Sequence, residues 1–196
     1  MIRYVSPYDD PLLWSGHSSL VDELASGLQS APSHVVLSVG GGGLLCGVME
    51  GLGRQSSPGW AHTNVVASET EGAASLLGAW HPARSNGNNN EDSQETGDGP
   101  NYAFRLPGIT SVATSLGALQ VTPAVLERAT SHPGQFQSLT CTDAEAVAAC
   151  AQFANEHKIL VEPACGAALA VAYSRRLRES ALQGAESVVI EVCGGR

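Results

Sequence analysis

The sequence has little positive charge and only one lysine. Lys158 is the single lysine among ten basic residues, so any chemistry that needs a lysine amine in this chain must use it or do without. With 19 acidic residues and a net charge of -9, the chain has no basic surface that could neutralise a row of phosphates. We therefore expect no nucleic-acid partner. Because no stretch reaches the roughly 18 apolar residues of a membrane span, we expect no membrane association either.

The cysteines show neither the pairing nor the spacing of a disulfide framework or a zinc site. They number five and include no CxxC pair: Cys46, Cys141, Cys150, Cys165 and Cys193. An odd set that lies mostly in apolar runs favours reduced, buried thiols. The N-terminal segment MIRYVSPYDDP also lacks the basic and apolar regions of a signal peptide. We expect a cytoplasmic protein.

Strand and helix patterns alternate along the chain. Strands are predicted at 34–39, 64–68, 159–161 and 187–192, and helices at 19–28, 123–131, 143–157 and 166–182. This alternation predicts an α/β fold, in which helices flank a parallel sheet within one domain over 1–196. The segment 81–100 is rich in Asn, Gly, Ser, Asp and Glu, and is predicted to be a disordered surface insertion. Since the last strand ends close to Arg196, we expect the domain to be partial.

A run of four glycines follows the first predicted strand and precedes helical spacing. Successive backbone N–H groups of Gly40, Gly41, Gly42 and Gly43 at a helix N-terminus could bind a phosphate. The run GGGGLLCG lacks the GK[ST] ending of a nucleoside-triphosphate loop, and it does not fit GxGxxG in any register. A single phosphate monoester remains as the ligand. The alternative is a glycine turn that only packs closely against the strand.

Several ordered motifs carry a family resemblance. The segments DDPLLWSGHSSLVDEL, SVGGGGLLCGVMEGL, EPACGAALA and VCGG resemble the C-terminal part of the L-serine dehydratases (serine ammonia-lyases), whose relatives include threonine dehydratases. The resemblance implies a partial tryptophan-synthase-β-like domain (fold type II) that uses pyridoxal 5′-phosphate. It further implies a lyase that converts L-serine, and L-threonine in some members, to a 2-oxo acid and ammonia, and a homodimer in the intact form.

The resemblance also assigns two sets of site residues. It implies that the four glycines hold the cofactor phosphate and that the thiol of Cys193 faces the pyridine nitrogen. A neutral thiol does not keep that nitrogen protonated, so the ring is a weaker electron sink and elimination is favoured over transamination. Taken alone, Cys193 is typical of a buried structural cysteine.

A monovalent-cation site is implied as well. Glu69 and Ala73 in SETEGA match the family's cation site, which also uses backbone carbonyls near Leu116 and Ala118. A carboxylate with several carbonyl oxygens suits a hard cation such as K⁺. The alternative is that Glu69 is a surface acid at the end of a strand.

The sequence departs from the family at the reactive lysine. That lysine lies in an N-terminal segment with no counterpart here, and Lys158 lies in KILVEPACGAALA, which matches a non-catalytic stretch. We assign no catalytic residue and expect this chain alone to be inactive. Two alternatives stay open: a non-catalytic phosphate-binding module that partners a full-length subunit, and another pyridoxal-phosphate lyase or synthase, such as a cysteine-synthase-like enzyme. Cys193 disfavours the cysteine-synthase-like alternative, because those relatives more often have a serine at that position.

Overall fold

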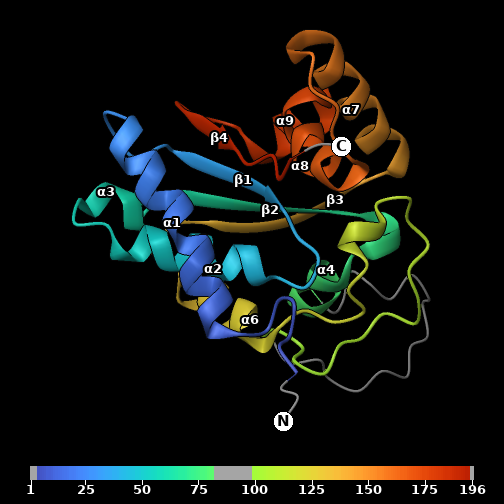
Figure 1. Ribbon diagram of the computed structural model, residues 1–196, viewed down its shortest axis with the longest axis horizontal. Coiled ribbons are helices and arrows are strands. Elements are labelled where there is room, and N and C mark those ends of the chain that lie inside the picture. Colours follow the sequence, from blue (N-terminus) through green and yellow to red (C-terminus); the bar gives the residue numbers. More distant parts are fainter. Residues whose placement is uncertain (1–3, 82–98, 195–196) are drawn as a thin grey trace.

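A parallel four-stranded sheet forms the centre of the protein. The computed structural model describes residues 4–81 and 99–194. The strands are β1 (His34–Ser38), β2 (Asn64–Thr70), β3 (Phe136–Cys141) and β4 (Val188–Ile190). They lie in the order β3-β2-β1-β4, and every pairing is parallel (Figure 1). This confirms the predicted α/β class.

Helices cover both faces of the sheet. On one face lie α1 (Pro11–Gly27), α2 (Gly43–Arg54), α3 (Pro58–Ala61), α4 (Ser75–Trp80) and α6 (Pro123–Ser131), and on the other lie α7 (Asp143–His157), α8 (Pro163–Tyr173) and α9 (Arg175–Ala181) (Figure 1). There are also two short 3-10 helices. η1 (Glu71–Ala73) comes directly after β2, and η2 (Thr114–Leu116) precedes α6 in the sequence. In the described ranges, no helix is both long and apolar enough to cross a membrane.

Side-chain alternation along β1 explains why both faces are apolar. Val35 and Leu37 pack into the cluster beneath α1 and α2, whereas Val36 packs into the cluster beneath α8. Successive residues of a strand point to opposite faces, so a strand covered on both sides reads as a continuous apolar run. All five residues of β1 are buried.

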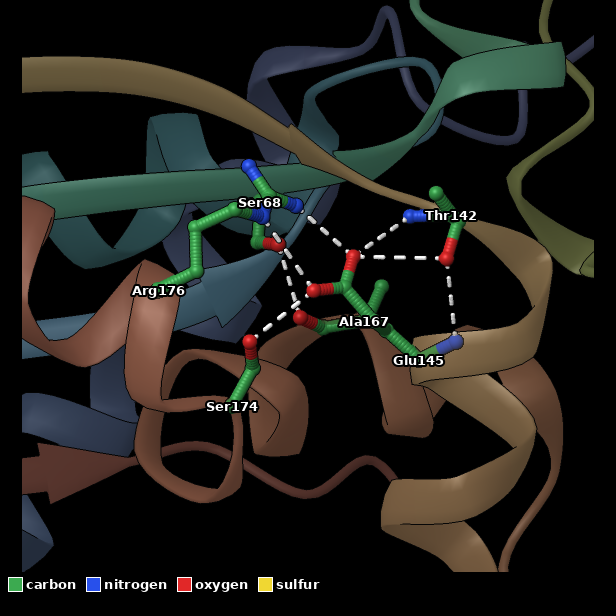
Figure 2. Close-up of polar contacts among 6 residues, drawn as sticks. All are labelled: Ser68, Thr142, Glu145, Ala167, Ser174 and Arg176. Carbon is green, nitrogen blue, oxygen red and sulfur yellow. Dashed lines mark hydrogen bonds and ion pairs between the residues drawn. The ribbon is translucent and has the colours of Figure 1, made fainter.

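Glu145 joins three segments on the α7–α9 side (Figure 2). Its carboxylate accepts hydrogen bonds from Thr142 N at 2.9 Å, Ser174 Oγ at 2.9 Å and Arg176 Nη2 at 2.7 Å. The Thr142 hydroxyl accepts from Glu145 N at 3.1 Å, which confirms the capping box expected before α7. Partial burial favours the neutral acid, but these hydrogen bonds outweigh it and lower the pKa of Glu145 to about 2.

Two sequence-based boundaries are wrong. The first helix starts at Pro11, not at residue 19, because Asp10 accepts a hydrogen bond from Leu12 N at 2.9 Å and Pro11 fits the first helical position. The predicted helix 166–182 is two helices. Ser174, with φ -78° and ψ 120°, is extended and separates α8 from α9.

One predicted strand is absent, and one strand was not predicted. The segment 159–161 forms no strand; it connects the left-handed Lys158, with φ 61°, to the start of α8, and it leaves Leu160 exposed. β3 was missed because the sequence FQSLTC mixes polar and apolar residues, as suits a strand at the sheet edge. Most of the predicted insertion at 81–100 lies outside the described residues.

Candidate functional site

The order of the strands brings the glycine run and Cys193 to the same place. β1 pairs with β4 in parallel register, and Glu191 N donates to Val36 O at 2.8 Å just beyond the paired residues. The carboxyl ends of both strands therefore lie at one edge of the sheet. β1 lies between β2 and β4, where the strand order reverses, and ligands of open α/β sheets bind at such switch points.

A cavity of about 420 Å³ opens at this edge. Its wall includes Gly40, Gly41, Gly42, Gly43, Leu116, Ala118 and Cys193, together with the polar residues Tyr8, His17, Ser38, Thr114, Ser115 and Glu162. The structure thus brings together the four glycines, the thiol and two of the residues assigned to the cation site. A cavity of this size is in the range that holds a cofactor-sized molecule.

The glycine run forms the end of the cavity at the N-terminus of α2. Gly42, with φ 93°, immediately precedes the first helical residue. Because glycine has no side chain, no side chain caps this end of the helix. Within residues 4–81 and 99–194, no hydrogen-bond acceptor is found for the N–H groups of Gly41, Gly42 and Gly43. Free N–H groups at the positive end of a helix dipole are the donors that a phosphate needs. The site therefore fits the phosphate of the expected cofactor.

Close neighbours keep this run in place and leave no room for side chains. A Cβ at Gly41 would overlap the ring of Tyr8, and one at Gly43 would lie 2.9 Å from the Tyr8 backbone. Thr122 N donates to Gly41 O at 2.9 Å and fixes the run from the other side. The glycines are thus required both for the conformation and for the close approach of a ligand to the backbone.

Cys193 lies at the cavity wall as a protonated thiol. Its Sγ donates to Glu191 Oε2 at 3.1 Å. Loss of hydration, followed by the hydrogen bond and the charge of Glu191, raises the pKa of Cys193 to about 12. Cys165, in the EPACGAALA motif, is buried and donates from Sγ to Gly194 O at 3.3 Å, so it anchors the segment that carries Cys193.

Glu69 is a fully buried acid, not a surface one. Its two carboxylate oxygens accept hydrogen bonds from Leu76 N at 2.8 Å and Leu77 N at 2.7 Å. Burial raises the pKa of Glu69 to about 8, although these backbone hydrogen bonds act in the opposite direction. Six positions later in the sequence, where α4 begins, the hydroxyl of Ser75 is buried without a partner among the described residues. A buried carboxylate close in sequence to an unpaired hydroxyl fits the oxygen ligands of a cation.

The other three residues assigned to the cation site are Ala73, Leu116 and Ala118. Ala73, in η1, and Leu116 belong to one apolar cluster. Glu69 and Ala73 do not line the cavity, whereas Leu116 and Ala118 do. Two of the four residues therefore lie at the cavity wall, and Glu69 and Ala73 are buried outside it.

Lys158 is separate from the cavity. It ends α7 as an exposed residue, and its Nζ donates to Asn155 O at 2.5 Å. It is not among the residues that line the cavity.

Sequence reasoning missed several polar residues of the wall. Ser115 Oγ donates to Glu162 Oε2 at 2.7 Å there, and His17 and Ser38 line the wall as well. Glu162 had a signal, since it opens the EPACGAALA motif. His17 comes from a helix distant in sequence, and only the tertiary packing of α1 against α2 places it.

Comparisons with known proteins identify the family of this chain. The family described as "Pyridoxal-phosphate dependent enzyme" matches residues 2–194. The human protein named L-serine dehydratase/L-threonine deaminase is 43% identical over 98% of this chain and 53% of its own length. The chain therefore spans about half the length of such relatives.

Solved structures share the same fold. An L-serine ammonia-lyase from the fungus Rhizomucor miehei superposes with a TM-score of 0.82 and 30% identity, over 98% of this chain and 55% of that one. A threonine deaminase from Solanum lycopersicum superposes with a TM-score of 0.75 at 20% identity, over 100% of this chain and 49% of that one, and so supports the fold alone. On the family match over nearly all of its length, the chain belongs to the pyridoxal-phosphate dependent enzymes.

Proposed function

We propose that this chain forms the phosphate- and ring-binding part of a pyridoxal-phosphate dependent dehydratase of L-serine, with L-threonine as a second substrate. One observation supports this most strongly: the free N–H groups of the glycine run and the Cys193 thiol line one cavity of cofactor size. The names of the human and fungal relatives supply the substrate class.

The glycine run would hold the cofactor by its phosphate. The N–H groups of Gly41, Gly42 and Gly43 donate to the phosphate oxygens, and the dipole of α2 favours the negative charge. The helix carries no acidic residue in its first turn that would oppose an anion. These contacts would hold the phosphate where α2 begins.

Cys193, which also lines the cavity, would face the ring. When bound, pyridoxal phosphate supplies an electron sink for the amino-acid substrate. Cys193 is neutral over the physiological range and cannot hold the ring nitrogen protonated as a carboxylate would. This residue thereby favours elimination of the β-hydroxyl group over transamination.

The single lysine would take no part in the reaction. Lys158 is exposed and outside the cavity, and loss of acid–base help alone typically costs about 10²–10⁴ in rate. The purified 196-residue chain, supplied with pyridoxal phosphate and L-serine, should release no pyruvate above the level given by free cofactor, as measured by coupled reduction with lactate dehydrogenase. Turnover that disappears in Lys158→Met would contradict this.

A chimera tests the proposed function itself. Residues 2–194 would replace the matched half of the human L-serine dehydratase/L-threonine deaminase. The chimera should deaminate L-serine, and it should lose this activity when Gly42→Ala is introduced. A folded chimera that binds pyridoxal phosphate but gives neither pyruvate nor 2-oxobutyrate would contradict the dehydratase assignment.

The buried acid would bind K⁺. We propose that Glu69, the carbonyl groups of Ala73, Leu116 and Ala118, and the Ser75 hydroxyl supply the oxygen ligands. The positive charge would offset the cost of burying the carboxylate of Glu69.

This cation site predicts a salt-specific effect on stability. K⁺ should raise the midpoint of thermal unfolding by about 3 °C or more over choline at equal ionic strength. The rise should disappear in Glu69→Gln and persist in Glu71→Gln, because Glu71 is exposed. Differential scanning calorimetry measures both variants, and an equal rise in Glu69→Gln would contradict the assignment of Glu69.

A further inference from the structure

The carboxylate of Glu191 contacts the Cys193 thiol but does not line the cavity. Glu191 Oε2 accepts the hydrogen bond from Cys193 Sγ at 3.1 Å, and Glu191 is not among the residues that line the cavity. The two residues are separated by one position in an extended segment, so their side chains point to the same side. Val192, between them, packs against the apolar cluster beneath α8, on the other face of the sheet.

The backbone fixes this carboxylate relative to the thiol. Glu191 N donates to Val36 O at 2.8 Å, which anchors Glu191 in register with β1. On the far side of Cys193, the thiol of Cys165 holds the carbonyl of Gly194 at 3.3 Å. The segment that carries the pair is therefore held on both sides.

Few ionisable groups face the pair. Cys193 interacts with Glu191 and Cys165 and lies near the hydroxyl of Ser38, whereas Glu191 interacts with Cys193 and His17. Burial raises the pKa of Glu191, while the Cys193 hydrogen bond and His17 lower it. Among these neighbours only His17 can carry positive charge, and it acts on the carboxylate.

We propose that Glu191 is a positioning residue that keeps Cys193 as a neutral thiol facing the cofactor cavity. Its negative charge opposes a second negative charge on the adjacent sulfur, and its oxygen accepts the S–H hydrogen bond in a fixed direction. A thiolate there would act on the ring nitrogen as a carboxylate does and would hold it protonated. That a cofactor ring lies next to the thiol rests on the proposed function, but the charge state of the thiol does not.

Alkylation of Cys193 tests this inference without cofactor or substrate. Cys193 is the exposed cysteine, whereas Cys46, Cys141 and Cys165 are buried and Cys150 is half-buried. Only the thiolate reacts with iodoacetamide, so the rate against pH reports ionisation of the thiol. The rate is followed by mass spectrometry of the peptide that contains Cys193.

Removal of the charge should make this thiol more reactive. In Glu191→Gln the amide oxygen can still accept the S–H bond, and in Glu191→Leu no acceptor remains. Both variants should react about tenfold faster than the wild type at pH 8, with pH profiles displaced to lower pH.

A matched variant and a structural readout keep the test decisive. Glu186→Gln removes an exposed acid just before β4 and should leave the rate unchanged. Circular dichroism checks that each variant is folded. Rates within twofold of the wild type in both folded Glu191 variants would overturn the proposal, and so would an equal acceleration in Glu186→Gln. Neither result depends on whether the chain serves a dehydratase.

Discussion

Replacing Gly42 by alanine should weaken binding of pyridoxine 5′-phosphate about tenfold or more, because the N–H groups of the glycine run would no longer converge on the phosphate. Gly42 has φ 93°, which is strained for alanine, and the new Cβ would overlap Cγ2 of Val125. Pyridoxine 5′-phosphate is the suitable probe, because it lacks the aldehyde and cannot react with Lys158. Isothermal titration calorimetry measures its affinity.

A glycine inside α2, the helix that Gly42 precedes, provides the control. Gly53 has no atom within 4 Å of an added Cβ, so Gly53→Ala should leave the affinity unchanged. It should also stabilise the protein slightly, since alanine is favoured over glycine inside a helix. Equal affinity of the wild type and a folded Gly42→Ala variant would show that the phosphate binds elsewhere.

Replacing Glu145 by alanine should lower the free energy of unfolding by about 2–3 kcal/mol at pH 7, because Thr142, Ser174 and Arg176 lose their common partner. The pKa of Glu145 is lowered to about 2 in the folded protein. Its contribution is therefore complete above the ordinary value of 4.5 and is lost as the pH falls toward 2. Urea unfolding at pH 7 and at pH 3 measures both effects.

An exposed ion pair on the adjacent helix gives the comparison. Glu179 accepts from Arg175 Nε at 2.7 Å, with both side chains largely exposed to solvent. Glu179→Ala should change the free energy of unfolding by less than about 0.5 kcal/mol. A similar loss in both variants, or a Glu145→Ala loss that does not shrink at low pH, would contradict the role of Glu145.

Sequence patterns within single segments predicted those helices and strands whose formation depends on nearby residues. The apolar run of β1, the capping box of Thr142 and Glu145, and the helix at 123–131 all agree with the structure. β3 and the break at Ser174 were missed, because an edge strand and a helix junction depend on what packs against them. The helix start at Pro11 carried a local signal, Asp-Pro, that was not used.

Part of the candidate site could likewise be predicted from the residues alone, and part could not. A phosphate site at the glycine run followed from the residues alone, whereas the role of Cys193 toward the same cofactor came from resemblance. The physical reason lies in the sheet order, which puts β4 beside β1 although about 150 residues separate them. Glu191 and His17 could not be assigned from sequence, because their relation to the thiol depends on that same pairing.

The most direct test asks whether one small molecule contacts both the glycine run and Cys193. Alkylation of Cys193 by iodoacetamide would be followed with saturating pyridoxine 5′-phosphate, and with inorganic phosphate at the same concentration. The ligand that carries the ring should protect Cys193 in the wild type and in Gly53→Ala but not in Gly42→Ala, and inorganic phosphate should not protect it. If bound pyridoxine 5′-phosphate leaves the alkylation rate of Cys193 unchanged, the glycine run and the thiol do not share a ligand.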